Sequence, residues 1–344
     1  MEQYTRIGMD TSKSVFQVHG VDASERPVLR KQLRRGAMIS FFQKLEPTVI
    51  GIEACGGSHH WARLLRSFGH EVKLLPPQYV KPYVKRGKND MADAEALCEA
   101  MSRPTMRFVP VKTADQQAAQ MLAGIREQMV RRRTQLSNAI RGYAAEFGLI
   151  AAKGLGRIEP LLERIRDDET LPALAKELFK VQERDYARLQ KEIELLDAKL
   201  MAWHRANPVS RRLAAIPGVG PVGASLLAIK VADAKAFKSG RHFAAWIGLT
   251  PKDHSTAGKN RLGVITRAGD ETLRSVLVVG ATALVQQLRR GRGRATPWLA
   301  ALLRRKQPKL AAVALANKTA RIAWKMMVSA EPYRPCLASD APTP

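Results

Sequence analysis

The chain contains few cysteines and no long apolar run. Its three cysteines, Cys55, Cys98 and Cys336, are too few for a disulfide framework or a four-thiolate zinc site, which indicates a reducing compartment. No run of 18 apolar residues occurs, and residues 1–10 have no uninterrupted apolar core. We therefore expect neither a membrane span nor a signal peptide. Together these absences predict a cytoplasmic protein without a membrane partner.

Acidic residues are also scarce, and the chain is strongly basic as a result. It has 57 Lys and Arg against 31 Asp and Glu, a formal net charge of +26. Most of the excess lies in residues 206–344, which carry 23 basic and 6 acidic residues. This segment is rich in Ala, Leu, Val and Ile at helical spacing, so we expect a folded domain and not a basic tail. The charge predicts a polyanionic partner, and nucleic acid above all.

Three segments and a tail differ in pattern. Residues 1–110 show three strands and then alternating helices and strands, which predicts an α/β domain with a mixed sheet and helices on its faces. Residues 111–205 are expected to be helical. Residues 206–335 predict a mostly helical domain, interrupted by a polar, glycine-containing stretch at 250–269. We expect residues 336–344 to form a disordered tail.

The end of the second segment has a heptad pattern. Its apolar positions are spaced alternately by three and four residues, with charged residues between them. Two structures fit this seam: a helix packed within its own domain, or a protruding coiled coil that dimerises. The charged flanks favour the coiled coil. The seam consists of Tyr186, Leu189, Ile193, Leu196, Leu200 and Trp203.

Four acids in the first segment form a candidate metal site. Asp10 and Glu53 each follow an apolar strand, so both can emerge at neighbouring ends of the sheet. Asp90 and Asp93 are three residues apart and share one side of a helix. Each acid alone could have an ordinary role, such as a helix cap or a solvated loop position. As a set, four converging carboxylates suit one or two Mg²⁺ ions that assist phosphoryl transfer.

The third segment opens with a glycine turn between two apolar helices. Gly218 and Gly220 lie in the run Ile216-Pro217-Gly218-Val219-Gly220-Pro221, which is typical of a helix-hairpin-helix. The glycines let a phosphate approach the turn, and the amides of the following helix can bind it. An ordinary helix–helix turn with a glycine C-cap also fits this pattern. The basic surroundings favour the phosphate site.

The polar stretch contains residues that could hold a nucleophile near a phosphate. Its first part reads Thr250-Pro251-Lys252-Asp253-His254-Ser255-Thr256-Ala257-Gly258-Lys259. Hydroxyl side chains beside His, Lys and Gly are compatible with nucleophilic attack on phosphorus. An ordinary surface loop has the same composition, so these residues alone leave both interpretations open.

Several motifs together resemble the DEDD insertion-sequence transposases. The resemblance covers nearly the whole chain and keeps the order and spacing of that family's motifs. It is carried by residues 7–13 (IGMDTSK), 51–57 (GIEACGG), 88–94 (KNDMADA), 243–251 (FAAWIGLTP), 254–259 (HSTAGK) and 265–270 (ITRAGD), together with the helix-hairpin-helix run. Two departures are a cysteine, Cys55, where the family often has threonine, and the adjacent hydroxyls of Ser255 and Thr256.

This resemblance implies a fold, a site and partners. It implies an RNase H-like (RuvC-like) domain at 1–110, a coiled-coil arm at 111–205 and a C-terminal transposase domain at 206–335. Asp10, Glu53, Asp90 and Asp93 match the acids that hold Mg²⁺, and Ser255 matches the serine that becomes joined to DNA. Donor and target DNA, bridged by a noncoding guide RNA, are the implied partners, and strand exchange proceeds through a Holliday junction. The candidate nucleic-acid contacts are Gly218, Gly220, Lys252, Lys259, Arg261 and Arg267.

Two other functions remain open at this stage. A Holliday-junction resolvase would use the same acids to activate water, with Ser255 incidental, but it leaves the C-terminal domain unexplained. A non-enzymatic DNA- or RNA-binding protein would make the four-acid pattern a coincidence. Because exchange between two duplexes needs several active sites, we also expect a homo-oligomer, a dimer or a tetramer, joined through the heptad seam. The expected location is the bacterial cytoplasm, in association with the nucleoid.

Overall fold

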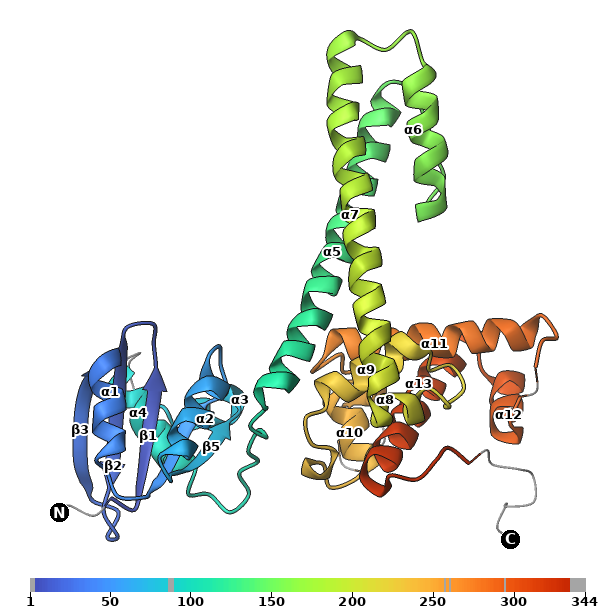
Figure 1. Cartoon of the computed structure of the whole chain (residues 1–344). Coiled ribbons are helices and arrows are strands. Elements are labelled where there is room, and N and C mark those ends of the chain that lie inside the picture. The colour runs from blue at the N-terminus through green and yellow to red at the C-terminus, as the bar shows by residue number, and fades with distance from the viewer. Residues whose placement is uncertain (1–3, 86–89, 257, 260, 294, 335–344) are drawn as a thin grey trace. The chain divides into compact units, whose positions relative to one another are not determined.

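The computed structural model describes residues 4–85, 90–256, 258–259, 261–293 and 295–334. The chain divides into two compact units, Met1–Gln117 and Ala118–Pro344 (Figure 1). The expected tail at 336–344 lies outside the described residues, as do Lys88 and Asn89 of the third acidic motif. Among the described residues, no helix combines the length and the apolar character needed to cross a membrane.

The first unit is built on a five-stranded mixed sheet. Its strands lie in the order β3 (Pro27–Arg34), β2 (Val15–Val21), β1 (Arg6–Thr11), β4 (Val49–Glu53) and β5 (Glu71–Leu75). β3, β2 and β1 pair antiparallel, whereas β1, β4 and β5 pair parallel. In the parallel register Met9 lies opposite Ile52, so the next residues, Asp10 and Glu53, are at the same edge of the sheet. The mixed sheet predicted from the sequence is confirmed.

Helices cover both faces of this sheet. Its central strands have apolar side chains on both sides, and these pack against the helices. One face packs against Phe42 and Leu65, and the other against Leu97 of the last helix. The helices of this unit are α1 (Arg35–Gln43) and α2 (Ser58–Ser67) on the first face, and α3 (Pro77–Val80), a 3-10 turn (Lys81–Tyr83) and α4 (Asp90–Ala100) on the second.

Contact between α4 and β1 depends on a glycine. A Cβ atom added at Gly8 would lie 2.1 Å from the Ala94 carbonyl oxygen and 2.6 Å from the Cys98 nitrogen. Only a residue without a side chain allows the helix backbone this close to the strand. This close approach fixes the first turn of α4 beside the end of β1.

The second unit begins with a helical arm. α5 (Ala114–Glu146) and α7 (Ala173–Ala206) run side by side, and α6 (Ile158–Asp167) packs against them (Figure 1). An ion pair between Arg126 and Asp197 links the two long helices. Arg133 also donates a hydrogen bond from Nη1 to Gln190 Oε1 (2.7 Å). The helical character predicted for this segment is therefore confirmed.

The heptad seam of α7 is used within the chain itself. Tyr186 is buried against α5 and α6, and Leu200 joins the core of the C-terminal helices. Leu189 and Ile193, between them, are also buried. A surface already covered in the single chain is not free to pair with a second copy. The seam therefore packs within the chain and not, as we expected, against a second copy. Internal packing is the alternative that the sequence had left open.

The rest of the second unit is a mostly helical domain, as predicted. Its core includes Phe243 and Ile247, and a row of alanines on the last helix lets neighbouring helices pack closely. Its helices are α8 (Pro208–Leu213), α9 (Pro221–Lys230), a 3-10 turn (Ala234–Ala236), α10 (Gly240–Trp246), α11 (Glu271–Arg289), α12 (Pro297–Arg305) and α13 (Pro308–Ser329).

The polar stretch at 250–269 contains a β-hairpin that the sequence did not predict. β6 (Pro251–Asp253) pairs antiparallel with β7 (Leu262–Ile265). Both strands are short and almost entirely exposed, so they lack the buried alternation by which strands are recognised in a sequence.

Candidate functional site

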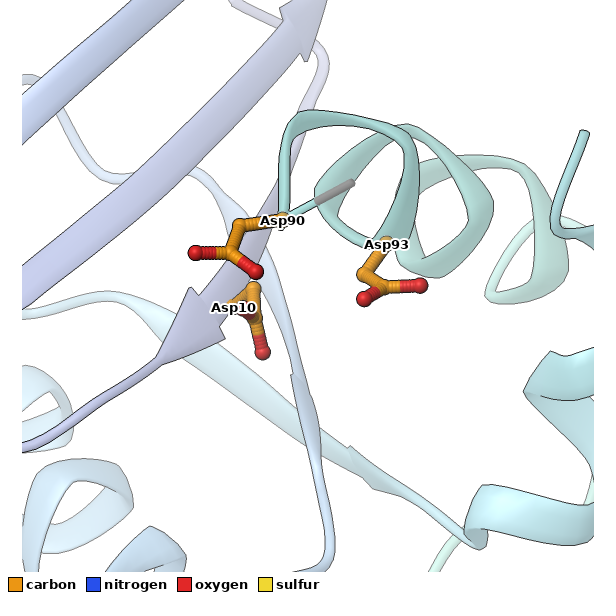
Figure 2. A group of neighbouring side chains, drawn as sticks. All are labelled: Asp10, Asp90 and Asp93. Carbon is orange, nitrogen blue, oxygen red and sulfur yellow. The ribbon is translucent and has the colours of Figure 1, made fainter. Parts of the chain in front are cut away.

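Three carboxylates converge in the first unit. Asp10 lies near the end of β1, and Asp90 and Asp93 lie in the first turn of α4. One ligand oxygen from each lies within 4.8 Å of the others, and Figure 2 shows the three side chains gathered around a common space. The N-terminus of a helix carries partial positive charge, which suits acidic side chains in its first turn. The convergence expected from sequence is present for these three residues.

Mutual repulsion and burial act on this group. Burial and the charges of Asp93 and Asp90 raise the pKa of Asp10 to about 6. A divalent cation among these oxygens would remove the repulsion, and carboxylate oxygens are the ligands that Mg²⁺ prefers. The donor set of this site therefore fits a hard divalent cation.

Glu53 is close to this cluster but is not one of its members. It ends β4, the parallel neighbour of β1. Burial, followed by the charge of Asp93, raises its pKa. A glutamate side chain has one more rotatable bond than an aspartate side chain, so the Glu53 carboxylate can take several positions beside the three aspartates.

Cys55 lies beside the same sheet edge, two residues after Glu53. Its Sγ atom is 3.5 Å from Thr11 Oγ1, and the cysteine is exposed. The departure from threonine at this position therefore keeps a small side chain in contact with Thr11, the last residue of β1.

In the second unit, Ser255 follows β6 at the tip of the hairpin and is held from two sides. Its N–H donates to Asp253 Oδ1 (2.9 Å), and its Oγ accepts a hydrogen bond from the Arg261 N–H (3.1 Å). Hydrogen bonds from the side chain and backbone of Ser255 lower the pKa of Asp253. The neighbouring hydroxyl of Thr256 is more exposed. The structure thus distinguishes the two hydroxyls, since only Ser255 has these fixed partners among the described hydrogen bonds.

Sequence reasoning missed Asp253 as a partner of Ser255. The signal was present, because Asp commonly accepts a hydrogen bond from the backbone two residues later in a turn. The same arrangement occurs at Asp233, which accepts from the Lys235 N–H (2.8 Å). A pattern this common could not have singled out Asp253.

The base of the hairpin is fixed to the helical core. Gly248 has a positive φ of 80°, and a Cβ atom there would lie 2.2 Å from the Ala268 carbonyl oxygen. Arg274 donates to the Ile247 and Ala268 carbonyls, each at 2.9 Å. Asn317 of α13 donates to the Leu249 carbonyl (3.1 Å). These contacts hold both ends of the hairpin against the core.

Four exposed cations share the hairpin with the serine. Lys252, Lys259, Arg261 and Arg267 all belong to the hairpin or its flanks, and all are exposed. Asp253 is the only acid between residues 234 and 269. This surface suits a phosphate-bearing ligand.

The glycine turn of the candidate helix-hairpin-helix lies between α8 and α9. Gly218 has a φ of +82°, and it packs against Gly280 of α11, where a Cβ atom would lie 1.9 Å from the Gly218 carbonyl oxygen. Gly218 therefore has a packing role, and its predicted contact with a phosphate stays a prediction. Gly220 is exposed at the N-terminus of α9, with open space around it.

Comparison with known proteins finds relatives that match both units of the chain. Three curated relatives match almost the whole chain. "Putative transposase y4pF/y4sB" of Sinorhizobium fredii is 70% identical over 335 residues, 97% of this chain and 87% of the relative. "Probable family 20 transposase" of Pseudomonas aeruginosa is 46% identical over 334 residues (96% and 99%). The transposase for insertion sequence element IS1328 of Yersinia enterocolitica is 39% identical over 324 residues (94% and 97%).

Two family profiles match as well. Residues 7–147 match a transposase profile of the DEDD type from IS110 elements, and residues 210–296 match the profile described as Transposase IS116/IS110/IS902 family. The chain belongs to the IS110 family of transposases. The first match spans the acidic cluster and Glu53, and the second spans the glycine turn and the Ser255 hairpin. As an IS110-family transposase, the protein acts on DNA, and the family resemblance found in the sequence is confirmed.

Proposed function

We propose that this transposase cuts and rejoins DNA strands through a covalent bond between Ser255 and a DNA phosphate. The observation that carries the proposal is the hairpin tip, where Ser255 is held by Asp253 and Arg261 amid exposed cations. A phosphate attracted there would meet one oriented hydroxyl.

The chemistry of such a step balances without an outside energy source. Ser255 Oγ bonds to phosphorus, and the bond from phosphorus to one sugar oxygen breaks, so that the sugar leaves with a free hydroxyl. The protein–DNA ester keeps the energy of the broken bond. Attack by a sugar hydroxyl of another strand then releases the serine and rejoins the DNA. Lys252, Lys259 and Arg261 would offset the charge on the phosphate oxygens during both steps.

We further propose an RNase H-like first domain that binds Mg²⁺. The sheet order, with three antiparallel strands followed by two parallel ones, supports this fold. Asp10, Asp90 and Asp93 would hold the ion, and Glu53 would join them or orient a bound water. When bound, Mg²⁺ supplies positive charge that stabilises a phosphate under attack.

Contacts with nucleic acid extend beyond the hairpin in this proposal. Gly220 and the N-terminus of α9 would bind a backbone phosphate, supported by the open space at that glycine. Arg267 would contact the same DNA from the far end of the hairpin. A noncoding guide RNA would pair with donor and target DNA, which the large basic excess would accommodate. Sequencing the RNA that copurifies with the protein tests this: one discrete species matching both DNA sites supports guidance, and a heterogeneous pool contradicts it.

The active assembly is proposed to be a homo-oligomer, and its contact surface would lie on the arm away from the heptad seam. Several large apolar side chains are exposed there around a hollow of about 450 Å³, namely Tyr143, Phe147, Leu178 and Val181. Exposed apolar clusters of this kind are typical of protein interfaces.

Ser255→Ala tests the proposal, with Thr256→Ala as its matched control. We expect Ser255→Ala to abolish denaturation-resistant protein–DNA adducts and strand exchange while DNA affinity stays within about twofold, because one neutral hydroxyl contributes little to phosphate binding. Thr256→Ala should keep the adducts. Adducts that persist in Ser255→Ala would move the nucleophile elsewhere. Free cut ends without any adduct would instead support the resolvase alternative, in which water attacks.

A further inference from the structure

A groove beside the Ser255 hairpin combines apolar side chains with cations. It has a volume of about 790 Å³ and lies between the hairpin and the helices α12 and α13. We refer to it as the Trp298 groove. Its side chains include Val264, Arg267, Trp298, Leu310, Lys318 and Arg321.

The apolar part of this groove is open to solvent. Val264 is 68% exposed, Leu310 is 54% exposed and Trp298 is 36% exposed. Lys318 Nζ lies over the indole ring of Trp298, 4.3 Å from its centroid. The aromatic ring and a positive charge are therefore presented together, the combination with which proteins bind a base and its phosphate.

The surroundings of the groove are strongly basic. Residues 272–330 contain 12 Lys and Arg and no Asp or Glu. No acidic residue lines the groove. In the described part of the chain, Arg267, Lys318 and Arg321 form no salt bridge. A partner with negative charge next to flat apolar surface matches this lining, and single-stranded nucleic acid offers both at every nucleotide. A duplex hides the faces of its bases within the stack.

The position of the groove points to the strand that is attacked. Pro251 lines the groove and is four residues from Ser255, so the two Cα atoms are separated by at most about 14 Å of extended chain. A strand whose phosphate reaches Ser255 can thus place a nearby base in the groove.

We propose that the Trp298 groove holds an unpaired base of the DNA strand next to the phosphate that Ser255 attacks. This assignment rests on the proposed function of Ser255. The base stacks at the indole ring, and Lys318, Arg321 and Arg267 contact the flanking phosphates. The groove thereby keeps the cut strand in place between cleavage and rejoining.

Binding of a labelled single-stranded DNA of about 16 nucleotides to the full-length protein tests the proposal. The same sequence is measured as duplex DNA and as single-stranded RNA. Trp298→Ala should weaken single-strand binding by about 5- to 100-fold, the range that loss of one stacked base gives. Leu310→Glu should do the same by placing negative charge in the groove. Leu195→Glu, at a side chain 59% exposed on α7, is the control and should bind as the wild type does.

Each outcome decides the assignment. The assignment is supported if both groove variants lose affinity for single-stranded DNA while their affinity for duplex DNA is unchanged. If Trp298→Ala does not fold, Leu310→Glu alone decides, because that side chain is mostly in solvent. Unchanged single-strand affinity overturns the groove while leaving adduct formation by Ser255 intact. The assignment to DNA is overturned if the wild type binds single-stranded RNA more tightly than single-stranded DNA and the groove variants lose affinity for the RNA instead. Wild-type protein that binds the strand but forms no adduct refutes the role of Ser255 and the groove's link to it.

Discussion

At the scale of single residues, the acids were predictable and their surroundings were not. Asp10, Asp90 and Asp93 were predicted to converge because one carboxylate follows an apolar strand and the other two share one side of a helix. Trp298 carries no such signal, because one tryptophan in a helical domain is indistinguishable from a core residue until its exposure is known. Asp253 was missed for a related reason, since its turn is a common one.

Asp10→Asn should stabilise the metal-free protein while removing metal-dependent activity. Burial and the neighbouring aspartates disfavour the Asp10 carboxylate, so its neutral replacement should raise the free energy of unfolding by about 1–2 kcal/mol at pH 7, allowing for solvent screening. Thermal unfolding in EDTA measures this. Added Mg²⁺ should raise the melting temperature of the wild type more than that of the variant. A less stable variant would contradict the repulsion.

The same pair of proteins gives a pH dependence with a defined sign. The pKa of Asp10 is raised in the folded state, from 3.8 to about 6, so the folded state holds the proton more tightly than the unfolded state. The stability that Asp10 contributes when protonated is present below about pH 4 and is lost as the pH rises through about 6. In EDTA, the stability advantage of Asp10→Asn over the wild type should therefore grow between these pH values. A constant difference would contradict the raised pKa.

Asp253→Asn should slow adduct formation without changing the adducted residue. Asparagine can still accept the Ser255 N–H hydrogen bond, but it removes the charge beside the serine hydroxyl. We expect a loss of about 100-fold in the rate, the lower end of the range for a group that assists proton transfer. Asp233→Asn, which changes the same type of turn away from the hairpin, is the control. Equal rates for all three proteins would show that Asp253 only shapes the turn.

At the scale of elements, predictions succeeded where burial imposes a period. The five strands and the helices α1, α2 and α4 of the first unit follow from alternating and helical apolar spacing, whereas the short α3 and the 3-10 turn after it were not predicted. The exposed hairpin at 251–265 has no buried face, so its sequence resembled a loop. The heptad pattern of α7 correctly indicated a packed seam, but spacing alone cannot say whether the partner helix belongs to the same chain.

Gly8→Ala tests how α4 is positioned. The added methyl group would collide with the backbone of α4 at Ala94 and Cys98, which must move away. We expect a destabilisation of about 1–3 kcal/mol and weaker Mg²⁺ binding, since Asp90 and Asp93 move with the helix. Gly36→Ala, where nothing lies within 4 Å of the new atom, is the control and should be neutral or stabilising. Thermal unfolding and Mg²⁺ titration measure both effects.

At the scale of the whole molecule, charge is the dominant property. The net charge of +26 is concentrated in the C-terminal segment, and the family assignment supplies DNA as the polyanion. The sequence predicted this partner class from composition alone, because long-range electrostatics depends little on the details of the fold.

Duplex DNA binding should therefore weaken steeply with salt. Each phosphate that the protein neutralises contributes about −0.9 to the slope of log affinity against log salt. Removing two C-terminal cations, in Arg304→Gln/Arg305→Gln, should make the slope shallower by about 2 if both contact phosphates. Lys191→Gln/Lys199→Gln on the arm is the charge-matched control and should leave it unchanged. Equal slopes for the two double variants would contradict a C-terminal DNA surface.

The central claim is that Ser255 becomes covalently joined to DNA during exchange. The most direct measurement is to trap the wild-type protein on a DNA substrate in Mg²⁺, digest the adduct and locate the modified residue by mass spectrometry. The account predicts a single nucleotide-bearing peptide with the phosphate on Ser255 Oγ. Cut DNA with free ends and no modified peptide, or a phosphate on another side chain, would contradict it.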